Sequence, residues 1–235
     1  MNQTAENLMF PEEGQVYFID KELHWTSFNV VKKLKIVLLN KYKLKKLKVG
    51  HAGTLDPLAT GLVIVCAGKQ TRNIEKYQAE EKEYIAEITL GATTPSFDLE
   101  TGIESSFPIE HISRDLVLET VDTFIGEQDQ VPPVFSAKNI DGKRAYSYAR
   151  KGKEVEMKPN RINISSIELL EYTKPVVKLK IVCSKGTYIR SFARDLGEAL
   201  NSGAYLSALR RTRIGRYKIE DALKINEFEE MINNT

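Results

Sequence analysis

The chain has 235 residues, of which 42% are hydrophobic and 28% are charged, and its formal net charge is +2. This balance is typical of a soluble globular protein with a sizeable core, and it excludes a fibrous or low-complexity chain. The N-terminal segment MNQTAENLMFPEEG has no basic region followed by an apolar stretch, and no later apolar run is long enough to cross a membrane. We therefore expect a cytoplasmic protein without a membrane span.

The first predicted element is a helix that begins at Thr26 or Ser27, either of which can cap its N-terminus. Apolar residues then recur at the spacing of one helix face, and these are Val30, Val31, Leu34, Val37 and Leu38. From Lys32 to Lys48 the chain carries eight lysines and no acidic residue. Such a run alone is typical of a solvated face, although a dense positive charge of this kind can also contact a polyanion.

The segment after the lysines, HAGTLDPLATGL from His51 to Leu62, places one carboxylate on a stiff loop. Gly53 permits a tight bend, and Pro57 fixes its own backbone and moves Asp56 away from helical geometry. The apolar run from Leu62 to Cys66 is typical of a buried strand and anchors the loop on its C-terminal side. The pattern therefore predicts a fixed acid at Asp56.

The middle of the chain predicts a strand and a helix. From Tyr84 to Leu90 apolar and polar residues alternate, which indicates a half-buried strand that ends at Gly91. A polar loop from Thr93 to Thr101 follows. Ser113 then opens a helix that Gly126 closes, with one apolar face made of Val117, Val121, Phe124 and Ile125.

The last part of the chain predicts another strand and another helix. Alternation from Val177 to Cys183 indicates a one-sided strand, and the turn from Ser184 to Thr187 leads into a helix that has Arg190 in its first turn. The two cysteines, Cys66 and Cys183, both lie in apolar runs, which fits a reducing compartment better than a disulfide framework. No spacing matches a zinc site, so we expect no metal.

Strands and helices that do not alternate regularly predict an α+β fold with a central mixed, mainly antiparallel sheet. We expect an N-terminal tail at residues 1–14, a catalytic region at 15–220 and a C-terminal helical tail at 221–235.

Several blocks together resemble the TruB-type tRNA pseudouridine synthases. The string HAGTLDPLATGL matches the family signature, whose aspartate in Gly-Thr-Leu-Asp-Pro is catalytic. Further blocks follow in the family's order: Asp20-Lys21, Lys82-Glu83-Tyr84, VPPVFSAKNIDGKRAYSYARKG from Val131, SKGTYIR from Ser184 and Leu-Arg-Arg from Leu209. The chain departs from the pattern at Glu22, where the family has proline, and at Lys138-Asn139, where it has Leu-Lys. The second departure moves the lysine by one position, and neither departure touches Asp56.

The resemblance implies a pseudouridine synthase fold with an inserted subdomain, and conversion of uridine to pseudouridine in the T-loop of tRNA (U55) without a cofactor. It implies that Asp56, Tyr84 and Arg190 are catalytic: the aspartate acts at the ribose C1′, the tyrosine stacks on the uracil, and the arginine holds the carboxylate. A planar guanidinium can do this through two hydrogen bonds, which a lysine cannot reproduce.

The resemblance further implies that His51 enters the RNA loop and that Leu209 forms an apolar wall of the uracil pocket. Candidate contacts to the RNA backbone are Lys21, the lysine-rich run before His51, Lys143, Arg144 and the arginines from Arg210 to Arg216. We expect tRNA to be bound through its T-arm by a monomer that needs no guide RNA. The chain also resembles a short form of the family, without the C-terminal RNA-binding module.

Two other functions remain open. A guide-RNA-dependent relative, as in the dyskerin branch, shares the aspartate motif but relies on protein partners. An RNA-binding or RNA-folding protein would act on tRNA without catalysis. Production of pseudouridine by the protein alone would separate the three.

Overall fold

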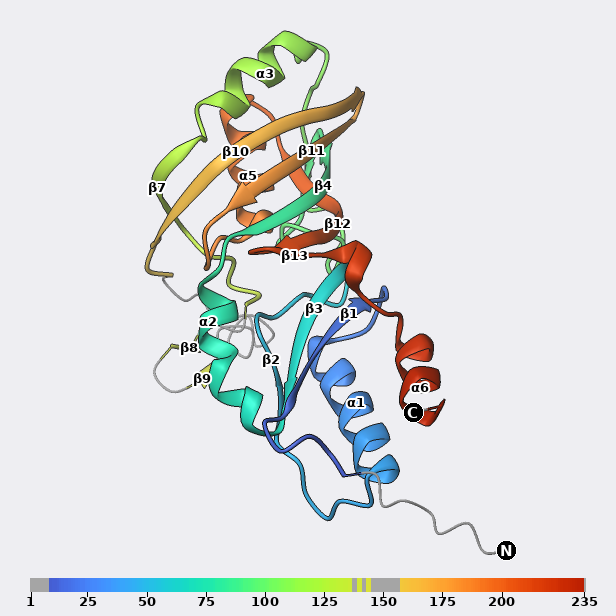
Figure 1. The fold of residues 1–235 in the computed structure, drawn as a ribbon. Coiled ribbons are helices and arrows are strands. Elements are labelled where there is room, and N and C mark those ends of the chain that lie inside the picture. The colour runs from blue at the N-terminus through green and yellow to red at the C-terminus, as the bar shows by residue number, and fades with distance from the viewer. Residues whose placement is uncertain (1–8, 137–138, 141–142, 145–156, 235) are drawn as a thin grey trace, which may run out of the picture. The chain divides into compact units, whose positions relative to one another are not determined.

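The computed structural model describes residues 9–136, 139–140, 143–144 and 157–234, and the chain divides into two compact units (Figure 1). Unit 1 comprises residues 1–80 and 210–235, and unit 2 comprises residues 81–209. The sequence suggested one continuous catalytic region from 15 to 220, whereas the backbone contacts join the two ends of the chain in unit 1. The helix expected in the C-terminal tail is α6 (Ile225–Asn234).

Unit 1 is built on an antiparallel pair of strands. Its elements are β1 (Gln15–Lys21), α1 (Ser27–Lys41), β2 (Val49–His51), β3 (Ala59–Ala67), η1 (Gly68–Asn73), α2 (Ile74–Ala79), β13 (Tyr217–Lys218), η2 (Ile219–Asp221) and α6. Both β1 and β2 pair antiparallel with β3. β12 (Ala204–Ile214) begins in unit 2 and ends in unit 1, where it lies beside β3.

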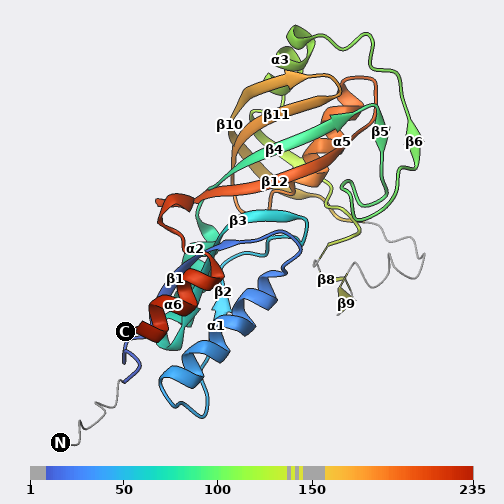
Figure 2. The ribbon, with the colours of Figure 1, turned by 90° about the vertical axis from the view of Figure 1, so that its right-hand side faces the viewer.

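Helices α1 and α6 lie side by side (Figure 2). α1 buries the five predicted apolar residues, and Thr26 caps its N-terminus by accepting a hydrogen bond from the Asn29 backbone. Phe228 of α6 contacts the ring of Tyr17 edge-on, with ring centroids 5.0 Å apart. On the strands themselves, Leu62, Ile64 and Cys66 form one buried cluster with Ala52 and Ile214. This core holds both ends of the predicted Asp56 loop.

Unit 2 is a sheet in the order β12–β4–β11–β10–β7. Besides β12, this sheet contains β4 (Lys82–Leu90), β7 (Gly126–Gln130), β10 (Asn160–Thr173) and β11 (Val176–Cys183). Two separate two-stranded sheets are formed by β5 (Ala92–Thr93) with β6 (Ser105–Ser106) and by β8 (Asn139–Ile140) with β9 (Lys143–Arg144). The helices are α3 (Arg114–Asp122) and α5 (Ile189–Ala199). β11 pairs antiparallel with both β4 and β10, and β10 pairs antiparallel with β7.

Burial in unit 2 follows the sequence patterns. Every second residue of β4 from Lys82 to Leu90 is buried, as the alternation predicts. Ser113 caps α3, but the helix ends at Asp122, so Phe124 and Ile125 lie beyond it and not on its face as predicted. Phe124 packs edge-on against Phe192 of α5, with ring centroids 5.2 Å apart. The α+β fold and mainly antiparallel pairing are confirmed.

Candidate active site

The Asp56 loop connects β2 to β3 in unit 1, and its two ends are held together because β2 and β3 pair. Gly53 has a φ of +102°, a conformation that side chains rarely adopt, so the bend requires glycine. The carbonyl of Asp56 accepts a hydrogen bond from the Ala59 amide at 3.0 Å. The Asp56 side chain is half-buried, and the predicted rigid support is therefore present.

Buried Ser27, the first residue of α1, fixes the residue before Asp56. Its hydroxyl accepts a hydrogen bond from the Leu55 amide at 2.8 Å and donates one to the Leu55 carbonyl at 3.2 Å. The Ser27 and Leu55 side chains are buried, so water does not compete for these bonds. The N-terminal end of α1 thus positions the backbone directly before the carboxylate.

Lys21 is fully buried at the end of β1. Its ammonium group donates to the carbonyls of Trp25 and Glu22 at 2.6 and 3.0 Å. Burial lowers the pKa of Lys21 to about 8, the negative charge of Asp56 opposes this shift, and the positive charge of Arg211 adds to it. We therefore correct the predicted phosphate contact: the Lys21 side chain is enclosed by protein, and its ammonium group donates to backbone carbonyls.

His51 is half-buried at the end of β2, just before the loop. Burial lowers its pKa, an interaction with the Gly53 backbone opposes this shift, and the charge of Arg211 adds to it, so that the net shift favours the neutral ring. Its Nδ1 atom is buried and has no hydrogen-bond partner within the described parts of the chain. A neutral ring agrees with a stacking role, which remains a prediction.

Arg190 lies in the first turn of α5, as predicted, and is buried in unit 2. Its Nε atom lies 3.6 Å from Oδ2 of Asp98, an ion pair in which both side chains are buried. Nη1 donates to the carbonyls of Phe135 and Ser96 at 2.9 and 3.3 Å. The predicted pairing of Arg190 with Asp56 joins residues of different units and remains a prediction.

Asp98 is the charged residue of this region that sequence reasoning missed. It lies in the segment that the sequence indicates only as a polar loop. Its Oδ1 accepts from the Glu100 amide at 2.9 Å, and its carbonyl accepts from the Thr94 hydroxyl at 2.7 Å. Neighbouring acids such as Glu100 are exposed, and no pattern in the sequence separates Asp98 from them.

Two other predicted residues lie on strands of unit 2. Tyr84 is buried on β4, in register with Ile181 of β11. Leu209 is half-buried on β12. Lys143 and Arg144 form β9, but their side chains lie outside the described part of the structure, as do residues 137 and 138 of the departing motif.

The basic run from Arg210 to Lys218 is less available to RNA than its sequence suggests. Arg210 forms a two-pronged ion pair with Asp20, with nitrogen–oxygen distances of 2.7 and 3.1 Å. Arg211 is buried with 1% of its surface exposed, which corrects its prediction as a phosphate contact. Arg216 lies over the ring of Tyr217, 5.2 Å from its centroid.

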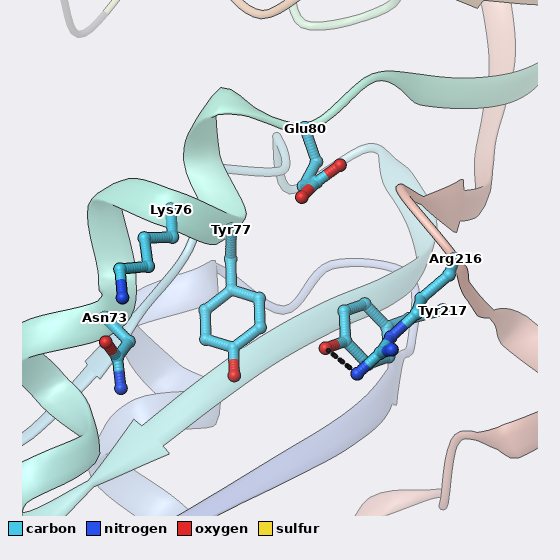
Figure 3. Close-up of a pocket in the computed structure, with 6 residues that line it drawn as sticks. All are labelled: Asn73, Lys76, Tyr77, Glu80, Arg216 and Tyr217. Atoms are coloured by element: carbon cyan, nitrogen blue, oxygen red, sulfur yellow. Dashed lines mark hydrogen bonds between the residues drawn. The ribbon is translucent and has the colours of Figure 1, made fainter.

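Unit 1 also contains two open pockets that the sequence did not predict. One, of about 470 Å³, is lined by Asn73, Lys76, Tyr77, Glu80, Arg216 and Tyr217 (Figure 3). The other, of about 490 Å³, has the basic residues Lys46, Lys48, Lys69 and Arg72 on its walls, together with Glu12, which pairs with Lys69 at 3.6 Å. The second pocket includes part of the lysine-rich run, and it is therefore the better candidate for contacts with a polyanion.

Among the described residues no group of three or more histidine, cysteine or acidic side chains could hold a metal ion. No described helix has the length and apolar character needed to cross a membrane.

The structure combines an α+β fold with a carboxylate on a supported loop, and comparison with known proteins identifies the family. The model of the TruB family pseudouridylate synthase N-terminal domain matches residues 41–189, and that of the tRNA pseudouridylate synthase B C-terminal domain matches residues 190–235. The chain belongs to the TruB family of pseudouridine synthases.

Relatives named tRNA pseudouridine synthase B support this assignment. The relative from Phocaeicola vulgatus is 56% identical, with 94% of each chain covered, and that from Flavobacterium johnsoniae is 52% identical, with 95% of this chain and 100% of the relative covered. A solved Cbf5-Nop10-Gar1 complex contains a chain that is 29% identical with a TM-score of 0.71. The match covers 93% of this chain but only 54% of that one.

Proposed function

We propose that this enzyme isomerises uridine to pseudouridine in the T-loop of tRNA, at U55. Its relatives support tRNA as the substrate. The observation that carries the proposal is the Asp56 loop, where one half-buried carboxylate follows a backbone held by hydrogen bonds to Ser27 and by the pairing of β2 with β3. The reaction needs such a group near the ribose C1′.

The isomerisation breaks the bond between N1 of uracil and C1′ of ribose and rejoins the base through C5. Atoms and electrons balance within the substrate, so no cofactor is consumed. Asp56 either stabilises or traps the positive charge that develops at C1′, as carboxylates do at glycosidic carbons, or acts as a base toward the sugar. Because the carboxylate is fixed before the substrate binds, little free energy is needed to reorganise the site in the transition state.

The other proposed roles belong to Tyr84, Arg190, His51 and Leu209. Tyr84 stacks on the uracil and assists removal of the C5 proton, and Arg190 supplies the fixed cation that favours an ionised Asp56. The target base is stacked in the folded RNA and must be flipped out, at a cost of a few kcal/mol. We propose that His51 fills the space left by the base and that Leu209 contacts the uracil.

The surface contacts we propose are to phosphates, because the backbone charge dominates affinity for RNA. Lys143, Arg144 and the basic pocket around Lys46 and Lys48 are the candidates. The enzyme acts in the cytoplasm as a monomer that finds the T-arm by its shape. No guide RNA takes part in this proposal.

A guide-dependent reaction is the second candidate, because a solved H/ACA RNP bound to a substrate RNA contains a chain that is 27% identical to this one, with a TM-score of 0.68. The test is to incubate the purified chain with an unmodified tRNA transcript, without guide RNA or protein partner, and to map pseudouridine. Product at U55 supports the proposal. Product only after addition of guide and partners supports the second candidate, and tRNA binding without product in either case supports a non-catalytic role.

A further inference from the structure

We propose that Arg211 is a positioning residue for catalysis, which fixes the backbone of the Asp56 loop from inside the protein. This inference rests on the proposed function of Asp56 and adds a residue that is expected to touch neither RNA nor the reacting atoms. It also gives a structural role to a basic residue that the sequence places in an RNA-binding run.

The first support is the set of atoms that the guanidinium contacts. Nε donates to the carbonyl of Leu62 at 2.7 Å, and Nη2 donates to the carbonyl of Gly53 at 3.2 Å. Nη1 lies 3.5 Å from the carbonyl of Thr54. Leu62 is in β3, and Gly53 and Thr54 are in the loop, so one side chain ties the start of the loop to the strand that follows it.

The second support is that these contacts require an arginine. A guanidinium is planar and carries five donors in a fixed fork, so it can bind carbonyls on two segments at once. A lysine ammonium is a single point at the end of a flexible stem, and it cannot reproduce this spacing. Since Arg211 is almost completely buried, water cannot replace lost contacts readily.

The third support is electrostatic. The positive charge of Arg211 lowers the pKa of both Lys21 and His51. His51 ends β2, directly before the loop, and Lys21 ends β1, which pairs with β3 after the loop. The charge of Arg211 therefore reaches the surroundings of Asp56, although its bonds are to backbone carbonyls. Burying a cation is costly, and the carbonyls of Leu62, Gly53 and Thr54 that Arg211 contacts offset part of this cost.

The fourth support is the anchor at the other end of the loop. Ser27 binds both backbone groups of Leu55, so Arg211 and Ser27 together restrain the three residues that precede Asp56. A catalytic group displaced by about 1 Å loses much of its rate even when its chemistry is unchanged. Loss of Arg211 is thus expected to affect turnover more than binding.

The test compares Arg211→Lys with Arg161→Lys, the same change at an exposed arginine of unit 2 that pairs with Glu127. Three quantities are measured: kcat on a tRNA transcript, the Kd for tRNA, and amide hydrogen exchange from Gly53 to Leu55. For Arg211→Lys we expect kcat to fall about thirtyfold, exchange in the loop to rise at least about tenfold, and Kd to stay within about twofold. Arg161→Lys is expected to change none of them.

Parental kcat in folded Arg211→Lys, or unchanged exchange in the loop, would overturn the proposal. If this variant does not fold, Arg211→Gln keeps a planar donor without adding an ammonium beside Lys21, and the same changes are expected. In the unmodified protein the Leu55 amide must exchange as slowly as those of β3, and rapid exchange there would overturn the proposal without any variant. If the parental protein forms no pseudouridine in the tRNA, the proposed function is wrong. The exchange measurements would still test whether Arg211 orders the loop.

Discussion

The two units hold their proposed catalytic charges in opposite ways. In unit 1 an acid, Asp56, is half-exposed on a loop whose surroundings contain the buried cations Lys21 and Arg211. In unit 2 a cation, Arg190, is buried and held by the acid Asp98 and by backbone carbonyls. The residues of opposite charge, Lys21 and Arg211 in unit 1 and Asp98 in unit 2, are buried and have protein partners. We therefore regard them as structural.

The difference teaches that charge type alone does not indicate which residue contacts substrate. Of the basic residues that the sequence suggested for RNA binding, Lys21 and Arg211 are among the most buried in the described chain. Both donate to backbone carbonyls close to the Asp56 loop. Their burial and their carbonyl partners indicate that they support the Asp56 loop and do not bind phosphate.

The largest expected effect is at the half-buried acid of unit 1, Asp56. Asp56→Asn removes the charge but keeps the shape, and we expect turnover to fall by at least about a thousandfold. Binding of tRNA should remain within about tenfold, because phosphate contacts dominate affinity. Single-turnover assays with filter-binding measurements check this, and near-parental turnover would remove Asp56 from its proposed role.

The next largest effect is at the buried cation of unit 2. Arg190→Lys keeps the charge but loses the fork, and we expect the rate to fall by about a hundredfold. Asp98→Asn is the companion variant: it leaves a buried guanidinium without its acid, which is expected to cost about 3 kcal/mol of folding free energy. Kinetics and chemical denaturation separate the two, and parental rates in Arg190→Lys would contradict the argument from geometry.

A smaller effect is expected from salt. If the basic pocket of unit 1 binds about three phosphates, affinity for tRNA should fall about twentyfold to fortyfold between 50 and 200 mM salt. Lys46→Ala with Lys48→Ala should reduce the slope of log Kd against log salt by about 1 to 2. Lys21→Met should leave that slope unchanged, and a change would restore Lys21 as a phosphate contact.

The smallest effect is the pH dependence that Lys21 contributes. Its pKa is lowered from 10.5 to about 8 in the folded protein, so between these values the unfolded chain binds a proton that the folded chain does not. Stability should therefore rise with pH across this window, by about 1 to 3 kcal/mol relative to Lys21→Met. Below pH 8 the ammonium is charged in both states and the contribution is constant. Urea denaturation at pH 7, 8, 9 and 10 measures it, and parallel profiles for the two proteins would show that Lys21 titrates normally.

Local patterns predicted the elements that bury one apolar face. The cap at Thr26, the alternation along β4 and the turn before α5 correctly predicted the helix, the strand and the place of Arg190. β10 was not predicted, because exposed and half-buried residues occupy most of Ser165–Thr173 and the apolar alternation is lost there. β12 was read only as a basic segment, since Arg210, Arg211 and Arg213 hide its strand pattern.

The same limit applies to the site. The loop around Asp56 could be predicted because glycine and proline restrict the backbone locally. Burial of Lys21 and Arg211 could not, because it depends on carbonyl partners that only the fold brings close: Arg211 and its loop partners are separated by 157 and 158 positions in the chain. The pairing of Asp98 with Arg190 spans two distant segments in the same way.

Gly61 shows how a residue without a functional group can imitate a catalytic one in a mutational screen. Its φ is +107°, and a Cβ atom placed there would lie 2.3 Å from the carbonyl oxygen of Arg211. Even alanine would force β3 and β12 apart at the residue that supports the Asp56 loop. A screen that measures only product would place Gly61 beside Asp56. A melting temperature measured for each variant would separate a variant with a disrupted fold from one that lacks a reactive group.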